Sequence, residues 1–290
     1  MTSFILYIIV LIISVFFNIL PRKVSLFFGR LIGATIYYFI PIRKHVAICN
    51  IKDNFPKLNN DEQYKLLKKT YIHFGMVLSD FLRQKELNLT KLRSVVNIDD
   101  ETFKVLKKNK GSIIMTGHLG NWEYFLPILG LNNIKFSVVA QKIKNSYLNK
   151  LFLKYRTFKN IQIIFKNEGK EKMINALKNN YHLGLASDQN ARKRGVLVNF
   201  LNIKVSIPKG AGIFHLKTNK PILIGYCIMD KNLNYNFTVK PLNISHIRDS
   251  KKDFVKCLNT IFAKHLGDMI NEYPEQYFWF HKMKNKKDYL

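Results

Sequence analysis

A histidine and a glutamate in the stretch TGHLGNWEY have side chains that can carry acid–base chemistry. His118 and Glu123 are five residues apart, so on a continuous helix their side chains would point about 140° away from each other. They can meet only if the chain turns between them, and Gly117, Gly120 and Asn121 permit such a turn. We therefore expect His118 in a loop and Glu123 in the first turn of the helix that follows.

The chemistry that suits this pair is the activation of a hydroxyl group. An imidazole, which titrates near pH 6.5, can accept the hydroxyl proton, while a carboxylate on its other nitrogen fixes the tautomer and stabilises the imidazolium. We expect His118 and Glu123 to take these roles, with Gly117 and Asn121 shaping the loop and a backbone N–H there stabilising an oxyanion. The chain has no G-x-S-x-G element, which agrees with direct attack of the hydroxyl on an acyl thioester.

The segments around this pair alternate between strand and helix. Short apolar runs predict strands at residues 111–116, 133–140, 161–165, 182–187 and 221–229, and helical periodicity predicts helices within 41–110, 148–155 and 170–179. This alternation indicates an α/β fold with a mixed, largely parallel sheet flanked by helices. His118 then follows the carboxyl end of a strand, where α/β proteins usually place their chemistry.

The N-terminus is apolar enough to attach to a membrane. The first 20 residues carry no charged side chain, and the apolar run that starts at Phe4 would form a helix about 25 Å long. Arg22 and Lys23 follow directly, which by the positive-inside rule places this end at the cytoplasm. We predict a hydrophobic membrane-anchoring segment at residues 1–40, spanning or inserted in one leaflet, and a catalytic domain at 41–290. The alternative is a pair of core helices in a soluble protein.

The charge balance is strongly basic. Forty-seven lysines and arginines face 19 aspartates and glutamates in 290 residues, a formal net charge of +28. Such a chain is expected to act beside polyanions, namely nucleic acid, an anionic membrane or acidic proteins. The three cysteines are widely spaced and show neither a disulfide framework nor a metal-binding pattern, and there is no phosphate-binding loop motif. We expect no metal and no cofactor.

Four further blocks accompany the histidine block in a fixed order. They are Arg43–Asn50 with Asn54-Phe-Pro56, a basic segment with Lys142, Asn145, Leu148 and Arg156, the Ser187-Asp188-Gln189 segment with Gly195 and Phe200, and Tyr273–His281. With GHLGNWEYF as an HxxxxD/E block, the chain resembles the bacterial lipid A biosynthesis acyltransferases, late enzymes that acylate a Kdo-bearing lipid A precursor. The resemblance covers nearly the whole length. It departs at Leu201-Asn202 and Lys282-Met283, which leaves the reaction type intact.

The resemblance implies a fold, an activity and a location. The fold would be like that of the glycerol-phosphate acyltransferases, with 41–290 as the acyltransferase domain. The activity would be transfer of a fatty acyl chain from acyl carrier protein to a hydroxyl of the lipid A precursor, in lipopolysaccharide or lipooligosaccharide biosynthesis. The location would be the cytoplasmic face of the bacterial inner membrane. The implied partners are acyl carrier protein, an anionic glycolipid and the membrane, without nucleic acid, and the positive charge suits these acidic partners.

The resemblance also distributes the site residues. His118 would be the general base and Glu123 would orient it, while Arg156, with Lys142 and Asn145, would bind the anionic acceptor. The predicted substrate-binding set is Gly117, Asn121, Lys142, Asn145, Arg156, Asp188 and Gln189. Asp188 and Gln189 end a predicted strand near the sheet edge that carries His118, and Asp188 is expected either to order the site or to pair with a basic residue.

Two other functions fit parts of the sequence. One keeps the chemistry and changes the acceptor to another anionic membrane lipid, such as a phospholipid, a glycosylated phosphatidylinositol or an aminolipid. The other is a basic membrane protein without enzymatic activity that tethers nucleic acid or anionic lipid. The second explains the charge and the apolar N-terminus but leaves the His118 block and the Asp188-Gln189 segment unexplained.

Overall fold

The computed structural model describes residues 2–247 and 253–289. Its strands are β1 (Val96–Ile98), β2 (Ile113–Thr116), β3 (Phe136–Ala140), β4 (Ile161–Phe165), β5 (His182–Ala186), β6 (Val196–Phe200), β7 (Ile203–Ile207), β8 (Ile222–Met229) and β9 (Tyr235–Pro241). Seven of them form one sheet in the order β1-β9-β8-β2-β5-β3-β4, and β6 and β7 form a separate antiparallel pair.

The main sheet is mixed and largely parallel, as the alternation of strands and helices predicted. β8, β2, β5, β3 and β4 run parallel to one another. β9 pairs antiparallel with β8, and β1 runs parallel to β9, so these two strands point the opposite way from the other five. The five parallel strands therefore share one carboxyl edge, which is the edge that His118 follows.

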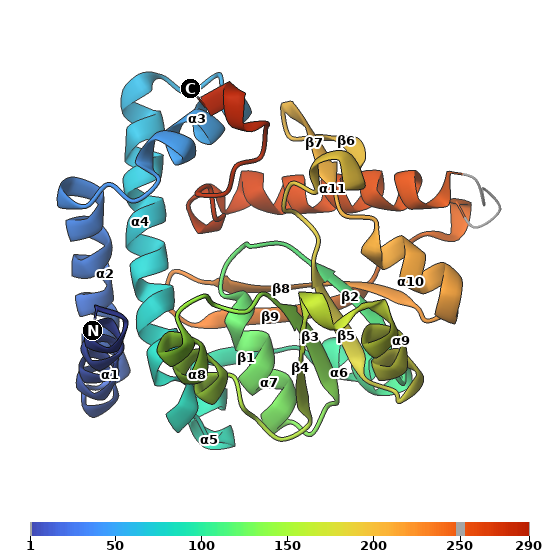
Figure 1. The fold of residues 1–290 in the computed structure, drawn as a ribbon, viewed down its shortest axis with the longest axis horizontal. Helices are drawn as coiled ribbons and strands as arrows, with labels where there is room; N and C mark the ends of the chain where they lie inside the picture. Colours follow the sequence, from blue (N-terminus) through green and yellow to red (C-terminus); the bar gives the residue numbers. More distant parts are fainter. Residues whose placement is uncertain (1, 248–252, 290) are drawn as a thin grey trace.

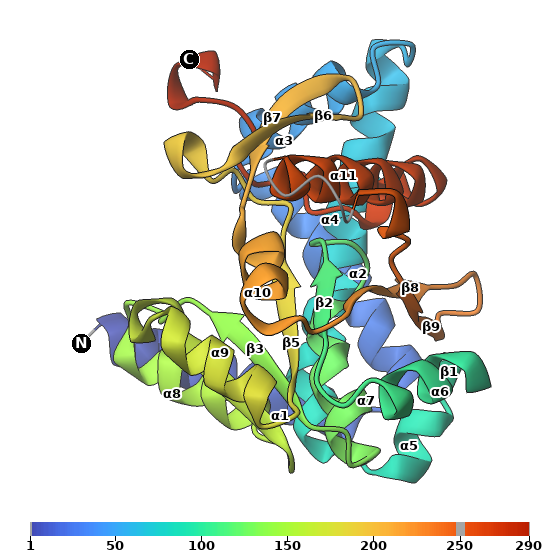
Figure 2. The same cartoon turned by 90° about the vertical axis from the view of Figure 1, so that its right-hand side faces the viewer.

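Helices cover both faces of the sheet. They are α1 (Thr2–Ile19), α2 (Arg22–Phe39), α3 (Lys44–Asn54), α4 (Asn60–Arg83), α5 (Leu89–Arg93), α6 (Asp100–Lys108), α7 (Phe125–Leu131), α8 (Ser146–Tyr155), α9 (Lys170–Lys178), α10 (Gly210–Thr218) and α11 (Phe254–Glu272). Figure 1 shows α1 and α2 on the outer side of α4, and Figure 2 shows α11 between the β6–β7 pair and the main sheet.

Two apolar clusters pack on the two faces of the sheet, and a third, around Phe17 and Phe81, joins α1, α4 and α8. Along β2, Ile113 and Met115 pack into the cluster that includes α9, α10 and α11, whereas Ile114 packs into the cluster that includes α6 and α7. Side chains alternate between the two faces of a strand, so a strand buried on both faces needs apolar residues at every position. This explains why the continuous apolar run at 111–116 becomes the central strand β2.

Three glycines let α2 lie unusually close to α4. A Cβ added at Gly29 would lie 2.7 Å from the carbonyl oxygen of Gly75, and one added at Gly33 or Gly75 would collide with the backbone of the facing helix. Helices normally stay 8–10 Å apart because of their side chains, and small residues remove that limit. The predicted anchor segment 1–40 is therefore packed against the rest of the chain through α2.

From Phe4 to Ile19, every exposed side chain of α1 is apolar. Its exposed side chains include Ile5, Ile9, Ile12, Phe16 and Ile19, spaced three or four residues apart so that they form one stripe. Among the described residues, no single helix is long and apolar enough to cross a bilayer. The α2–α3 pair would be by length and composition, but its two helices meet at 95°.

Some elements were not predicted. β1 lies within the segment 41–110 that was expected to be helical throughout, and β6, β7 and β9 fall in stretches with no assignment. The three residues of β1 are too few to show a period, and β9 alternates polar with apolar residues only over seven positions. The strand conformation of β1 depends on its pairing with β9, which lies far along the chain, whereas β6 pairs with β7 and β9 with β8 as sequence neighbours.

Candidate active site

The carboxyl ends of β2 and β5 bring two distant segments of the chain together. The strands are parallel neighbours with Thr116 opposite Ala186. Beyond this pair, the Ser187 N–H donates to the Thr116 carbonyl at 2.8 Å. His118 follows β2 and Asp188 follows β5, and because parallel strands end at the same sheet edge, the two side chains meet there.

Asp188 holds the imidazole of His118. The His118 Nδ1 donates to Asp188 Oδ1 at 2.8 Å, and the His118 backbone N–H donates to Asp188 Oδ2 at 2.8 Å. The Asp188 side chain is 1% exposed, and its two contacts hold His118 in place. Glu123 was expected on the second ring nitrogen; instead, within the described part of the chain, it shares no hydrogen bond with His118. The pairing of β2 with β5 places Asp188, rather than Glu123, at the ring nitrogen Nδ1.

Glu123 pairs with Arg156. Glu123 lies in the 3-10 turn η2 (Trp122–Tyr124) that leads directly into α7, close to the predicted first helical turn. Arg156 ends α8 and donates from Nε to Glu123 Oε2 at 2.8 Å and from Nη2 to Oε1 at 2.5 Å. Its Nη1 takes part in neither bond, and both residues line the cavity described below. A two-point contact of this kind fixes the orientation of the guanidinium.

The contact with Asp188 makes His118 easier to protonate than a histidine in water. Burial alone would lower the pKa of His118, but the charge and hydrogen bond of Asp188, with the charge of Glu123, outweigh it and raise that pKa above 6.5. Burial would raise the pKa of Asp188, yet its contacts with His118 lower it below the usual value. Asp188 is therefore ionised when His118 takes up a proton, which is the arrangement that stabilises an imidazolium.

The side-chain amide of Gln189 lies between two histidine rings. Its Nε2 is 3.1 Å from His118 Nε2 and 2.5 Å from His281 Nε2. An amide nitrogen can only donate, so both imidazole Nε2 atoms act as acceptors and the proton of His118 stays on Nδ1, at Asp188. Burial, and next the positive charge of His118, lower the pKa of His281 to about 4, so this ring is neutral at pH 7.

Aromatic rings enclose the imidazole of His118. The Trp122 ring centroid lies 4.7 Å from it and the Phe278 centroid lies 6.3 Å from it. The chain after α11 is held here because the Phe278 N–H donates to the His118 carbonyl at 2.9 Å. The Tyr273–His281 block thus forms one wall of the site, which explains why that block accompanies the histidine block.

The loop between His118 and Glu123 is tied down by its backbone. Gly120 has a φ of +65°, the left-handed conformation that glycine adopts without strain. The Gly120 N–H donates to the Gln276 carbonyl at 2.9 Å, and the Asn121 N–H donates to the Cys227 carbonyl at 2.8 Å. A backbone N–H of this loop was expected to stabilise an oxyanion, and those of Gly120 and Asn121 are already engaged in these bonds. Gly117 packs against Leu266 and does not line the cavity.

A cavity of about 1640 Å³ opens beside His118, and its two kinds of lining suit a lipid substrate. Its lining includes the apolar side chains of Phe125, Leu126, Phe136, Val138, Phe152 and Met173. It also includes basic side chains that are exposed except for Lys284, and we call them the basic rim: Lys166, Lys170, Arg192, Lys193, Arg194, Lys204, Lys209 and Lys284. The size exceeds that of an ordinary small-ligand pocket.

Lys142 and Asn145 lie at the approach to α8. Lys142 is exposed, and its neighbours Gln141 and Ile143 line the cavity. The Asn145 Oδ1 accepts from the backbone N–H groups of Tyr147 and Leu148 and so caps the helix that carries Arg156. Asn145 therefore contributes to the position of Arg156 through α8.

The structure places two residues beside His118 that are absent from the predicted site. His281 shares the Gln189 amide with His118, and Trp122 packs on the imidazole of His118. Their signals were present, since Trp122 lies within the histidine block and His281 ends the C-terminal aromatic block. What was missing was the proximity of the two blocks, which are more than 150 residues apart.

The chain matches the family model described as bacterial lipid A biosynthesis acyltransferase over residues 1–284. It therefore belongs to the bacterial lipid A biosynthesis acyltransferase family, as the order of its motifs predicted.

Curated relatives and a solved structure were also found. A phosphatidylinositol mannoside acyltransferase of Mycolicibacterium smegmatis is 23% identical over 46% of this chain and 45% of its own length. The protein of the same name in Mycobacterium tuberculosis is 23% identical over 58% of this chain and 55% of its own. The match thus spans about half the length of these relatives. A crystal structure of a 1-acyl-sn-glycerophosphate acyltransferase from Thermotoga maritima aligns with 87% of this chain and 98% of its own, at 14% identity and a TM-score of 0.37.

Proposed function

We propose that this protein transfers a fatty acyl chain from an acyl carrier protein thioester to a hydroxyl of a Kdo-bearing lipid A precursor. The observation that carries the proposal is the state of His118. Its Nδ1 is held by the buried Asp188, its Nε2 carries no proton and accepts from the Gln189 amide, and the ring lines the large cavity. That is the tautomer that a general base requires.

The reaction proceeds by direct attack of the acceptor on the thioester. The acceptor hydroxyl takes the place of the Gln189 amide at His118 Nε2 and gives its proton to that nitrogen. Its oxygen forms a bond to the thioester carbonyl carbon, and the resulting imidazolium is stabilised by Asp188. The tetrahedral intermediate then breaks its C–S bond, and the leaving thiolate takes the proton from His118. An ester and a free thiol result, with no change of oxidation state.

Glu123 and Arg156 support this reaction as a pair. Glu123 binds one edge of the guanidinium, through Nε and Nη2, and the remaining Arg156 Nη1 is available to an anionic group of the substrate in the cavity. The basic rim, together with Lys142 near α8, attracts the phosphates and carboxylates of the acceptor and the acidic carrier protein. The apolar lining accommodates the acyl chain.

Membrane attachment is part of the proposal. The apolar stripe on α1 is exposed, and α2 adds exposed Phe27 and Leu31. A continuous apolar surface of this kind is unfavourable in water and suits the acyl region of a bilayer. With Arg22 and Lys23 after it, the helix pair would sit at the cytoplasmic face of a bacterial inner membrane.

The test is a defined reconstitution. Purified protein, acyl carrier protein thioester and Kdo-lipid IVA in mixed micelles are incubated, and acylated product is measured by mass spectrometry. The wild type should form product, and His118→Ala should reduce the rate by about 10²–10⁴-fold, the usual value of a general base. Full activity of His118→Ala would contradict the mechanism.

A second acceptor is favoured by the relatives, which are named phosphatidylinositol mannoside acyltransferases. A mannosylated phosphatidylinositol also carries a hydroxyl acceptor and a phosphate, so the same site chemistry applies. Running both acceptors in the same reconstitution distinguishes the two, and lipid analysis of a deletion strain adds an independent answer. Unaltered lipid A acylation in that strain would favour the second acceptor.

A further inference from the structure

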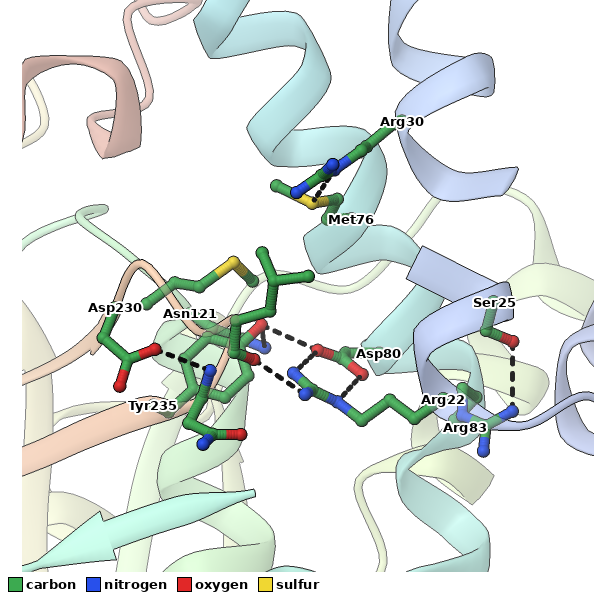
Figure 3. Close-up of polar contacts among 12 residues, drawn as sticks. Arg22, Ser25, Arg30, Met76, Asp80, Arg83, Asn121, Asp230 and Tyr235 are labelled. Carbon is green, nitrogen blue, oxygen red and sulfur yellow. Dashed lines mark hydrogen bonds and ion pairs between the residues drawn. The ribbon is translucent and has the colours of Figure 1, made fainter. Parts of the chain in front are cut away.

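A buried chain of polar side chains runs from the N-terminal helices to the catalytic loop (Figure 3). Arg22 donates from Nε and Nη2 to the two carboxylate oxygens of Asp80, at 2.9 and 2.7 Å. The Tyr235 hydroxyl donates to Asp80 Oδ2 at 2.9 Å, and Asn121 Nδ2 donates to the Tyr235 hydroxyl at 3.0 Å. We call these four residues the polar chain; they come from α2, α4, β9 and the loop between His118 and Glu123.

Burial makes this arrangement demanding. The Asp80 side chain is 0% exposed and that of Arg22 is 16% exposed. Two charges taken out of water gain little net stability even when well paired, and apolar side chains of the same volume usually serve a core equally well. What the pair does specify is geometry, because an unpaired buried charge is so costly that α2 and α4 must keep the register in which Arg22 meets Asp80.

The same arginine also holds the β8–β9 turn. Arg22 Nη1 donates to the Leu233 carbonyl at 2.7 Å. Leu233 has a φ of +66°, an unusual conformation for a branched residue. The turn is closed by Asp230, whose Oδ1 accepts from the N–H groups of Asn232 and Asn234. Arg22 thus fixes the turn from which β9 carries Tyr235 to Asp80.

At its other end the polar chain reaches the catalytic loop. Asn121 lies three residues after His118 and two before Glu123, and it is 0% exposed. It does not line the cavity, so it is not placed to touch a substrate. Its side chain is joined to Tyr235 and its backbone to Cys227, so β9 and β8 together hold the middle of the loop.

A second arginine fixes the corner between α1 and α2. Arg83, at the end of α4, donates to the Phe17 and Leu20 carbonyls and to the Ser25 hydroxyl. The end of α4 therefore binds the corner through Arg83 and the first turn of α2 through Asp80. The helices that we propose lie in the membrane are in this way connected by named contacts to the loop that carries His118.

We propose that Arg22, Asp80 and Tyr235 are positioning residues, which act through Asn121 to hold the His118–Glu123 loop in register with the α1–α2 pair. This rests on the proposed function for its catalytic readout. None of the three contacts the cavity, so their effect falls on the geometry of the catalytic loop. Loss of the polar chain should therefore lower kcat and leave the KM of donor and acceptor unchanged.

The test uses Tyr235→Phe, which removes one hydroxyl and keeps the ring and the Arg22–Asp80 pair. We expect kcat to fall about tenfold, because the hydroxyl's hydrogen bonds with Asp80 and Asn121 are both lost, with each KM within about twofold of wild type. The matched control is Tyr71→Phe, since Tyr71 is also buried and its hydroxyl donates to the Ile42 carbonyl, away from the loop. It should keep the wild-type kcat.

Two further measurements separate positioning from general destabilisation. In an Asn121→Ala background, Tyr235→Phe should have no additional effect on kcat, because the two residues act in series. Hydrogen exchange of the 117–124 amides should accelerate in Tyr235→Phe and remain unchanged in Tyr71→Phe. The proposal would be overturned if the effects of Tyr235→Phe and Asn121→Ala on kcat multiply in the double variant. It would also be overturned if Tyr235→Phe and Tyr71→Phe show the same kcat and the same exchange of these amides.

The exchange measurement needs no substrate, so it remains decisive if no acyl transfer is found for the wild type. In that case the proposed function fails while the polar chain is still tested. If Tyr235→Phe does not fold, Arg22→Lys, which keeps the charge and loses the two-point contact, takes its place with the same expected outcomes.

Discussion

At the scale of single residues, the site is defined by which carboxylate pairs with which basic side chain. Asp188 accepts from both the ring and the backbone of His118, whereas Glu123 accepts from Arg156. The two acids therefore do different work although each adjoins the same catalytic loop. Asp188 determines the tautomer and pKa of His118, and Glu123 determines the orientation of a guanidinium.

The pH dependence of the rate follows from this division. A general base must be neutral, so kcat/KM should rise with pH through the pKa of His118, which lies above 6.5. Asp188→Asn removes the charge that raises this pKa, so the acid limb should move to lower pH while the rate falls by about 10²–10⁴-fold. A pH–rate profile of the two proteins measures both effects.

The control for that profile is Glu123→Gln. Glu123 contributes the last of the four effects on the pKa of His118, so its removal should shift the limb in the same direction by a smaller amount. An acid limb that stays in place in Asp188→Asn would contradict the role given to this carboxylate.

At the scale of secondary-structure elements, α4 is the member that connects the N-terminal helices to the sheet. It carries Gly75, which lets α2 approach, and Asp80, which pairs with Arg22. Its capping box at Asn59 and Glu62 fixes where the helix begins. The position of α2 thus depends on backbone contact as much as on side-chain packing.

Gly75→Ala should destabilise the fold by about 1–3 kcal/mol, the usual cost of overpacking. The added methyl group would collide with the backbone of Gly29 on the facing helix, and backbone cannot rotate away as a side chain can. The unfolding midpoint in denaturant measures the change. Gly210→Ala is the control, because a Cβ there would meet Phe214 at 3.7 Å and Leu185 at 3.9 Å, both ordinary contacts. An equal loss in both variants would contradict the close approach of α2 and α4.

At the scale of the whole molecule, an apolar outer face and a net charge of +28 act together. The apolar stripe gives affinity for the bilayer interior and the positive charge gives affinity for anionic headgroups. Both would hold the basic rim close to the surface where an anionic lipid acceptor resides.

Replacing Ile5, Ile9 and Ile12 by serine should abolish most binding to vesicles of anionic phospholipid. Each side chain is about half exposed in the fold, so its loss costs little folding stability. Each isoleucine that enters the bilayer contributes about 1–2 kcal/mol to insertion. Co-flotation with vesicles measures the effect. Leu216→Ser, at an equally exposed position on α10, should bind like the wild type; undiminished binding of the triple variant would contradict membrane insertion of α1.

Folding stability should decrease in acid because of three buried histidines. Burial is the main cause that lowers the pKa of His73, His182 and His281 to about 4. The unfolded chain then binds more protons than the folded one below pH 6.5, so stability should fall between about pH 6.5 and 4, by up to a few kcal/mol. The raised pKa of His118 has the opposite sign, and its contribution is complete by about pH 6.5.

Denaturant unfolding at several pH values checks this dependence. His182 packs in the core with Nδ1 at 2.6 Å from the Ser112 hydroxyl. His182→Asn should therefore show a smaller loss of stability between pH 6.5 and 4 than the wild type, whatever its stability at neutral pH. Parallel curves for the two proteins would contradict the assignment of a neutral buried ring at position 182.

The sequence by itself determined the order of strands and helices around His118, the loop-then-helix placement of His118 and Glu123, and the apolar N-terminus. These depend on local periods and on residues that permit turns, which are readable within a short window. The tertiary structure alone decided that Asp188 holds His118, that Glu123 pairs with Arg156, and that Arg22 reaches Asp80. Each of these contacts joins residues 33 to 70 positions apart, and strand pairing and helix packing bring them together. A carboxylate near a histidine in sequence is only a candidate partner, because the sheet determines which one is near in space.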